Sequence, residues 1–442
     1  MIQLSDHFDY KRLIKFTLPS IAGMIFASVY SIVDGFFVSN FVGKTEFTAL
    51  NLIFPFRMIL GAVGNMIGVG GTALVAKTLG EGRKEKANDM FSFFIYMCIG
   101  SGVFFSAIAL LFLEEVALML GATPELLPHC VAYGRILLIA LPVMMLQYTF
   151  QGFLIAAEKP QISMYVTVAA GLTNIVLDAL FVAVLRWGLT GAALATAIGQ
   201  TVGGIIPAIL FSRKNSGWPL HLGRCSVDFR ALAQACSNGA SSFLSSISSS
   251  VVGILFNFQL LAYAGPDGVA AYGVIMYVEM IFLAAAFGYT SGISPVISYH
   301  YGAENTDELK NLVKRSIVIV AVSSVMMFGL AQVLARPVTL IFTSYDQALA
   351  EMTTHAFRMY SFNFIVSGMG IFGSTMFAAL NNGPVASVLS FLRLVVYQAG
   401  FVLILPVIFG IEGIWVTMAV ANLCSAITAL IFMAVYRKKY HY

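Results

Sequence analysis

The chain has 442 residues, of which 59% are hydrophobic and only 10% are charged, whereas about a quarter of the residues in an ordinary soluble domain are charged. Together with a mean hydropathy of +0.87, this composition excludes a water-facing surface over most of the chain. The formal net charge is only +4, with no basic tail and no basic patch interleaved with aromatic residues, so we expect no nucleic-acid partner.

The N-terminal stretch MIQLSDHFDYKRLIKF mixes acidic and basic residues ahead of the first apolar run. No small-residue cleavage site follows a short apolar region, so we expect no removable signal peptide. Runs of about 20 apolar residues, the length that crosses a bilayer as a helix, then recur along the chain. They are too long and too uniformly apolar for barrel strands. The twelve expected spans lie near residues 15–40, 48–75, 89–112, 131–156, 160–185, 189–212, 232–262, 268–298, 311–335, 351–379, 383–409 and 412–436.

The loops between these spans differ in their content of basic residues. Of the 25 Lys and Arg residues, only Lys44, Arg186 and Arg336 fall in one set of loops. Arg57, Arg135, Arg358 and Arg393 fall within expected spans, and all the others fall in the opposite loops or at the termini. Because basic loops stay in the cytoplasm, we expect both termini there, and a multi-pass protein of the plasma (inner) membrane.

The two halves of the chain align at a constant offset of 222 residues, as shown by Ala49 and Ala271, Gly70 and Gly292, and Gly80 and Gly302. The same offset relates Ala156-Ala157 to Ala378-Ala379, and Gly188 and Gly191 to Gly410 and Gly413. Because each half holds six spans, their symmetry axis is expected along the membrane normal. We therefore predict an all-α fold of two six-helix bundles, residues 1–212 and 231–442, joined by a cytoplasmic linker at 213–230.

Acidic residues inside a membrane are costly and mark ion or substrate paths by default. Asp34 in the first span and Asp178 in the fifth are expected at similar depth in the N-terminal half. Asn174 lies one turn before Asp178, and the sixth span carries Thr196 and Gln200 on one face. No basic residue lies in the interior of these three spans. The group predicts a site for a proton or a sodium ion; the alternative is a set of hydrogen bonds that only holds the helices together.

Glu279 is the third acid within a span, in the eighth, and Met276 and Met280 flank it. We interpret it as an anionic anchor for a cationic substrate, beside methionines that suit a promiscuous binding surface. The alternative is an ion pair with Arg358 or Arg393 in the same half, with the methionines serving only for packing.

Several of these segments resemble the multidrug and toxic compound extrusion (MATE) family over essentially the whole chain. They are the first span with Pro19, Asp34 and the VDGFFVS stretch, the GEGRKEKAN and YGAENTDELK loops, and the NIVLD segment. Asp34, Asn174 and Asp178 resemble the DinF-type branch, and Glu279 is similar to its counterpart in the MepA-like multidrug exporters.

The resemblance implies a V-shaped pair of bundles that exports drugs in exchange for sodium or protons. It also implies a cation site in the N-terminal half, formed by Asp34, Asn174, Asp178 and Thr196. The C-terminal half lacks the acidic pair that another branch uses, since its first span offers only Asn257 and Gln259.

Three functions are therefore compared. The first is a secondary antiporter that exports lipophilic, mostly cationic compounds, with small organic molecules and the bilayer as its partners, no cofactor and no obligatory protein partner. The second is a flippase for lipid-linked or other amphiphilic substrates. The third, a membrane enzyme, lacks support because the sequence has no GxSxG, P-loop or dinucleotide motif. None of its five cysteines forms a CxxC or has a histidine at ligand spacing.

Overall fold

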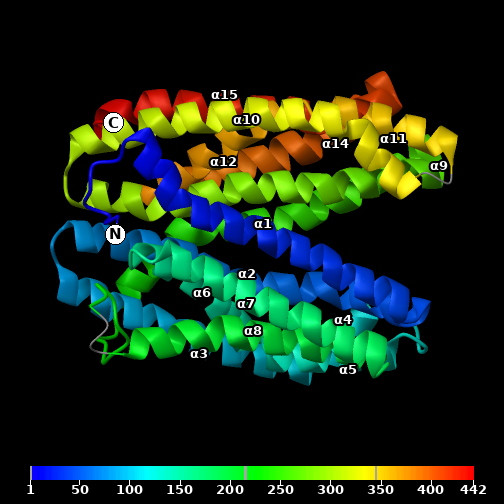
Figure 1. The fold of residues 1–442 in the computed structure, drawn as a ribbon, viewed down its shortest axis with the longest axis horizontal. Helices are drawn as coiled ribbons and strands as arrows, with labels where there is room; N and C mark the ends of the chain where they lie inside the picture. Colours follow the sequence, from blue (N-terminus) through cyan, green and yellow to red (C-terminus); the bar gives the residue numbers. More distant parts are fainter. Residues whose placement is uncertain (1, 214–216, 344–345) are drawn as a thin grey trace.

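The computed structural model describes residues 2–213, 217–343 and 346–442, and within those residues every regular element is a helix (Figure 1). Residues 214–216 of the expected linker lie outside the described residues. Long apolar segments form helices here because a helix satisfies its backbone hydrogen bonds internally, as a lipid environment requires. Aspartates cap three of the described starts: the Asp9 carboxylate accepts a hydrogen bond from the backbone N of Arg12, that of Asp228 from Ala231, and that of Asp346 from Leu349.

The N-terminal half consists of α1 (Tyr10–Phe41), α2 (Lys44–Gly80), α3 (Lys84–Leu111), α4 (Leu113–Met119), α5 (Leu127–Ile139), α6 (Leu141–Ala156), α7 (Pro160–Asp178), the π-helical segment η1 (Ala179–Val184) and α8 (Gly188–Ser212). The C-terminal half consists of α9 (Phe229–Gly302), α10 (Thr306–Thr343), α11 (Gln347–Tyr360), α12 (Asn363–Ala379), α13 (Gly383–Phe391), the π-helical segment η2 (Leu392–Ala399), α14 (Gly400–Phe409) and α15 (Ile411–Tyr440). Figure 1 shows the two halves as two layers of roughly parallel helices, with α1 running obliquely between them.

Ten helices in the described part of the chain are long and apolar enough to cross a membrane, and two bent pairs raise the number to twelve if each counts as one span. The predicted all-α membrane fold with twelve spans is thereby confirmed. The expected spans 232–262 and 268–298 form α9 together, with a break at Gly265. The bent pairs are α5–α6, at 49°, and α11–α12, at 43°. Ala140 precedes α6 and Phe362 precedes α12, which are positions 222 residues apart, so the bend belongs to the repeated unit.

The halves meet along α2 and α9, where the helix backbones touch at two glycines. A Cβ added to Gly80 would collide with the carbonyl oxygen of Tyr299, and one added to Gly302 would collide with that of Lys77. Lys77 and Tyr299 are related by the same 222-residue offset as the two glycines. The pseudo-two-fold axis therefore passes between α2 and α9 at this crossing, where only glycine allows such a close approach.

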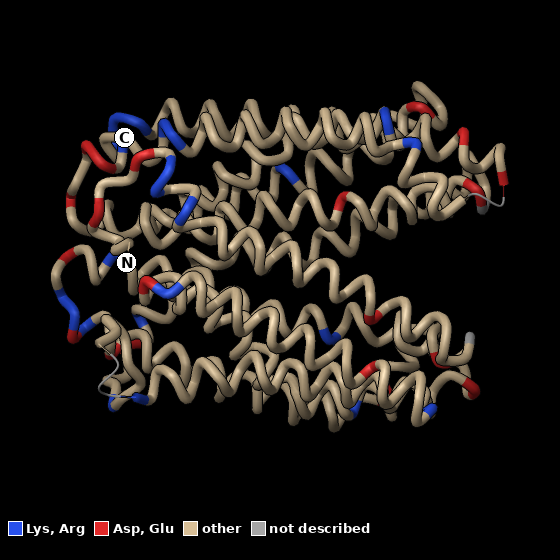
Figure 2. Tube along the Cα trace, viewed as in Figure 1, with Lys and Arg blue, Asp and Glu red and all other residues tan. Residues whose placement is uncertain are grey.

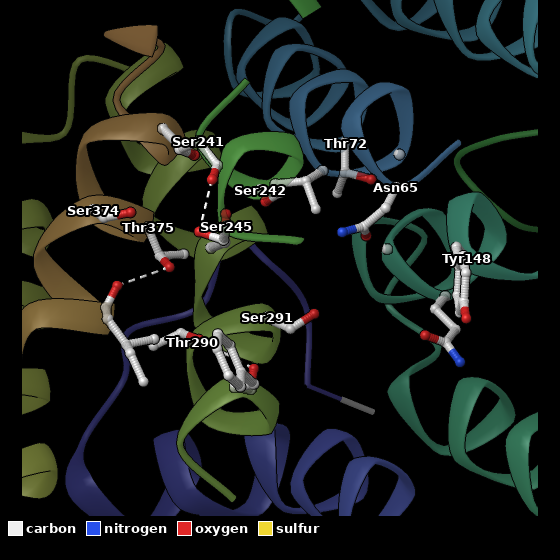
Figure 3. A pocket seen from close by; sticks show the side chains of 18 of the residues that line it. Asn65, Thr72, Tyr148, Ser241, Ser242, Ser245, Thr290, Ser291, Ser374 and Thr375 are labelled. Atoms are coloured by element: carbon white, nitrogen blue, oxygen red, sulfur yellow. Dashed lines mark hydrogen bonds between the residues drawn. The ribbon is translucent and has the colours of Figure 1, made fainter. Parts of the chain in front are cut away.

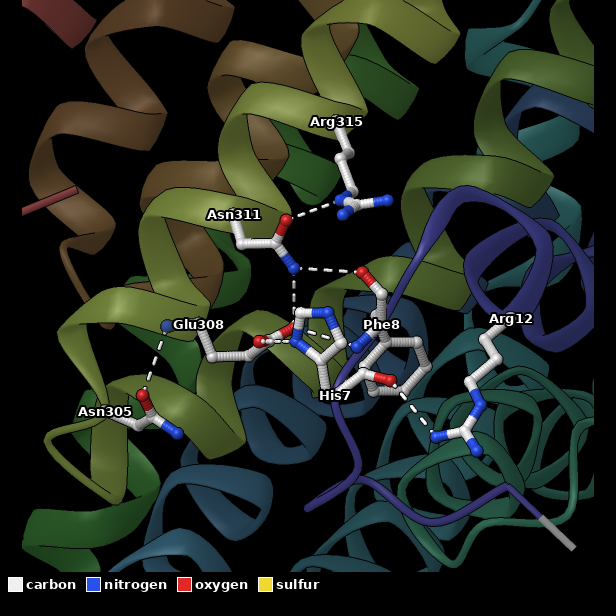
Figure 4. Close-up of polar contacts among 7 residues, drawn as sticks. All are labelled: His7, Phe8, Arg12, Asn305, Glu308, Asn311 and Arg315. Carbon is white, nitrogen blue, oxygen red and sulfur yellow. Dashed lines mark hydrogen bonds and ion pairs between the residues drawn. The ribbon is translucent and has the colours of Figure 1, made fainter.

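Both termini lie at one end of the molecule, and Figure 2 shows Lys and Arg residues concentrated there. The segment ahead of α1 bridges the two halves at this end. The backbone N of Leu4 donates to Glu158 Oε1 of the N-terminal half at 2.8 Å, and that of Phe8 donates to Glu308 Oε1 of α10 at 2.9 Å. His7 also contacts Glu308, and Asn311 donates to the carbonyl of Phe8 (Figure 4). These contacts hold the halves together beside the glycine crossing.

Candidate functional site

The predicted acidic pair comes together between α1 and α7. The side chains of Asp178 and Asn174 are close neighbours of the Asp34 carboxyl group. Asp178 is fully buried and Asn174 almost so. Asp34 Oδ1, both carboxylate oxygens of Asp178 and Asn174 Nδ2 are buried without a hydrogen-bond partner. Two ionised carboxylates here would place like charges together in a poorly solvated site.

The helix that carries Thr196 and Gln200 packs against the same side of α7. A Cβ on Gly199 would come within 3.0 Å of the Asn174 Cβ and within 2.9 Å of a backbone carbonyl oxygen of α7, so α8 approaches α7 closely at this level. The helix α8 follows α7 after a short turn and runs antiparallel to it. Thr196, three residues before Gly199, therefore lies about one helical turn closer to the level of Asp178 than Gly199 does. Gln200 Oε1 is another buried oxygen without a donor. The predicted residues thus gather at one depth among α1, α7 and α8.

Arg57 of α2 is a basic neighbour that the sequence reasoning did not assign to this group. Its side chain is 4% exposed, its Nη2 donates to the Met144 sulfur at 3.0 Å, and its Nε has no partner. The guanidinium acts electrostatically on Asp34. The first, fifth and sixth spans do lack a base, but the second span supplies one from the side. The repeat offers a signal for it, since Arg57 occupies the position equivalent to Glu279 in the other half.

Glu279 contacts neutral donors instead of an arginine. Its carboxylate accepts hydrogen bonds from Tyr360 Oη at 2.7 Å and from Asn363 Nδ2 at 3.2 Å. A buried chain of amides continues from Asn363 to Asn422 and then to Gln398. The alternative ion pair with Arg358 or Arg393 is therefore wrong, and the sequence reasoning missed Tyr360 and Asn363. Because both partners are neutral groups, neither compensates a negative charge on Glu279.

Met276 and Met280 are about half exposed on α9, at 47% and 40%. The Ser28 hydroxyl of α1 donates to the carbonyl oxygen of Met280 at 3.4 Å, which places this turn of α9 against α1. The structure keeps the two methionines near Glu279 along the helix, but the Glu279 carboxylate is turned toward α11 and α12.

A cavity of about 320 Å³ lies between the two halves, and its volume falls within the range of pockets that bind small organic molecules. Asn65 and Thr72 of α2 and Tyr148 of α6 form the wall on one side, and Ser241, Ser245 and Ser374 lie on the other (Figure 3). Neither the predicted coupling residues nor Glu279, Met276 and Met280 belong to its lining. The cavity reaches α1 at Met24, ten residues before Asp34, which is about 15 Å along a helix axis.

No group of three or more His, Cys, Asp or Glu side chains that could hold a metal ion occurs in the described parts of the chain. The candidate ion site therefore differs from a multi-carboxylate or histidine metal centre. The side chains predicted for it are two carboxylates with amide and hydroxyl oxygens, and such donors suit a proton or a hard monovalent cation.

The chain resembles known proteins in both sequence and fold. The family profile described as MatE matches residues 19–180 and 241–404. The chain is 26% identical to the multidrug export protein MepA of Staphylococcus aureus strain MRSA252 over 427 residues, covering 96% of this chain and 93% of the relative. It is also 26% identical to MepA of Staphylococcus haemolyticus strain JCSC1435 over 432 residues, covering 97% of this chain and 92% of the relative.

Two solved structures share the fold over nearly their whole lengths. A MATE crystal structure in complex with MaL6 has a TM-score of 0.93 at 23% identity and covers 98% of both chains. A multidrug resistance MATE family transporter of the MOP superfamily, in an outward-facing conformation, has a TM-score of 0.92 at 24% identity and covers 98% of this chain and 97% of its own.

Proposed function

The chain belongs to the MATE family of multi-pass membrane transporters, and from this premise we propose that it exports lipophilic organic compounds in exchange for protons or sodium ions. The match of the family profile to both halves carries the premise. Transport rather than an enzymatic reaction follows from it, because the relatives are export proteins. The coupling ion and the charge of the substrate are our proposals.

The observation that carries the coupling proposal is the contact between Asp34 and Asp178. Two adjacent carboxylates in a poorly solvated site repel each other, and binding one proton or one cation removes that repulsion. A site of this kind fills from the side with the higher ion potential and empties on the other side. Asp34 belongs to α1 and Asp178 to α7, so filling the site changes the force between two helices that can shift relative to each other.

We assign separate roles to the residues of this site. Asp34 and Asp178 take up the proton, or share the charge of a sodium ion. Asn174 and Thr196 supply amide and hydroxyl oxygens that complete a sodium shell. Arg57 limits how much negative charge accumulates before the ion arrives. Because its guanidinium already offsets part of the charge, only one proton or one monovalent ion is needed per cycle.

Cationic compounds are the substrate class that Glu279 supports. Its carboxylate has neutral partners in Tyr360 and Asn363, so its charge is free to attract a cation that enters between the halves. Met276 and Met280 offer flexible apolar contacts beside it. Such a surface accommodates compounds of different shape, as a multidrug exporter requires.

The proposed cycle places both termini in the cytoplasm of a plasma (inner) membrane protein. The basic residues gathered at the terminal end (Figure 2) support that orientation. The glycine crossing and the N-terminal segment close this end, so the described conformation resembles the one in which a substrate leaves to the outside. The halves 1–212 and 231–442 would rock about the glycine crossing, with the linker 213–230 following their motion.

The test is dye transport in proteoliposomes that hold the purified full chain. A sodium gradient and a pH gradient are imposed in separate experiments, and ethidium movement is followed by its fluorescence with DNA inside the vesicles. We expect one of the gradients to drive ethidium against its own gradient, and ionophores that collapse it to stop transport. Ethidium that only equilibrates under both gradients would contradict coupling.

A further inference from the structure

Arg393 is the one charged residue in the lining of the cavity between the halves. It lies in the π-helical segment η2, a rare helical form that is often found at functional sites. Its side chain is only 7% exposed, so most of the guanidinium is removed from water. A charge in this position needs a partner, since an unpaired buried ion is among the most unfavourable features of a folded chain.

The partners that the protein supplies do not meet this need. Arg393 Nη2 donates to the hydroxyl of Ser245 at 3.5 Å, the limit of hydrogen-bond length, and its Nε has no partner. No Asp or Glu belongs to the lining residues of the cavity. Glu279, the acid of this half within a span, is bonded to Tyr360 and Asn363 instead. A guanidinium has five N–H donors in a planar fork that matches a carboxylate, and most of them remain available.

The wall of the cavity beside Arg393 contains hydroxyls that are fixed in direction. Ser245, Ser246 and Ser249 of α9 each donate their hydroxyl proton to a backbone carbonyl one turn earlier. Their oxygens therefore face the cavity mainly as acceptors, and Arg393 is its strong donor. Phe287 and Ile371 add apolar surface to the lining, which can hold the hydrocarbon part of a ligand.

The internal repeat shows that the fold itself does not require this arginine. The position equivalent to Arg393 in the N-terminal half is Gly171. There the close neighbours are the rings of Phe26 and Tyr30 on α1, and the helix packs without any charge. The arginine is therefore an addition to the shared scaffold, at the place where that scaffold borders the cavity.

We propose that this cavity is a subsite for the carboxylate of an amphipathic organic compound, with the carboxylate bound in bidentate fashion by Arg393 and the apolar part against Phe287 and Ile371. The proposal rests on the transport function above and names a substrate class for it. Glu279 lies outside this cavity, so the two residues attract opposite charges at separate places. A compound that carries a carboxylate is selected here, whether or not it also carries a cationic group.

The test compares two dyes that differ only in this group, rhodamine 110, with a free carboxylic acid, and its methyl ester rhodamine 123. Their binding to the purified protein in detergent is measured by fluorescence anisotropy, and their transport is measured in proteoliposomes. We expect the wild-type protein to bind the acid more tightly than the ester. Arg393→Gln should weaken binding of the acid about tenfold or more, as for loss of a charge-assisted bidentate contact, and change binding of the ester less than about twofold.

Arg393→Lys keeps the charge without the planar fork and should restore part of the affinity for the acid. Arg358→Gln removes an exposed arginine of the same half and serves as the matched control, with both dyes bound as in the wild type. Equal weakening of the acid and the ester in Arg393→Gln, or no change in either, would overturn the proposal. Binding is measured without any gradient, so a failure of ion-coupled transport would leave this result interpretable and separate.

Discussion

The two halves share one scaffold but differ in the charges that it carries. The four predicted coupling residues Asp34, Asn174, Asp178 and Thr196 correspond, at the 222-residue offset, to Phe256, Val396, Gly400 and Met418. All four positions are apolar in the C-terminal half, although the helix bends and the glycine crossing are repeated there. The duplicated fold therefore does not duplicate the chemistry. An ion site in one half and ligand contacts in the other would let one rigid body respond to the ion while the other holds the cargo.

One pair of equivalent positions is charged in both halves, but with opposite sign: Arg57 in the N-terminal half and Glu279 in the C-terminal half. Arg57 lies near Asp34 in a group of like-charged acids, and Glu279 lies among neutral donors. The same point of the scaffold thus offsets negative charge in one half and provides negative charge in the other. Substitutions in matched positions can test whether the N-terminal half binds the ion while the C-terminal half contacts the substrate.

The largest effect is expected at the acidic pair. Asp34→Asn and Asp178→Asn should each lower gradient-driven ethidium export more than about a hundredfold, because an amide neither releases a proton nor lends a full charge to sodium. The protein should still reach the membrane in normal amount. Asp307→Asn, at an almost fully exposed acid of α10, is the control. Export at the wild-type rate in both variants would contradict the assignment of the ion site to the N-terminal half.

A smaller effect is expected where the halves are alike. Gly80→Ala and Gly302→Ala each place a Cβ against a backbone carbonyl of the other half. Overpacking of this kind costs about 1–3 kcal/mol, so both should lower the melting temperature of the purified protein by several degrees, and by similar amounts. Gly100→Ala and Gly329→Ala, in helices with open space around the added Cβ, should leave it nearly unchanged. Unequal effects of the first two would show that the crossing is not symmetric.

The smallest effect is expected from the charge-reversed pair. Glu279→Gln should lower export of ethidium about threefold to tenfold while leaving a neutral dye nearly unaffected, since it removes one partly exposed charge that attracts cations. Arg57→Gln should lower export of both dyes by the same factor, because it acts on the ion site. The measurement is the export rate of each dye by each variant, in vesicles of the same composition. Equal losses of both dyes in Glu279→Gln would indicate a structural role.

Much of the fold was predictable because it depends on local properties of the chain. The twelve spans follow from apolar runs whose length must match the bilayer, and the repeat follows from residues at a fixed offset. The bend within the expected span 131–156 falls beside Pro142, at the start of α6, and a proline inside a span can kink a helix. The bend within 351–379 has no proline beside it, so only the structure reveals it.

The candidate sites were likewise predictable where they depend on local properties of the chain, and not where they depend on packing between distant segments. The sequence by itself determined that Asp34, Asn174 and Asp178 lie in the membrane at one depth, since depth follows from position along a span. Only the tertiary structure decided that Arg57 lies beside the acids, that Tyr360 and Asn363 hold Glu279, and that Arg393 borders the cavity. These contacts depend on the rotation of each helix about its axis and on the angle at which it crosses others. Both are set by side-chain packing between segments far apart in the chain.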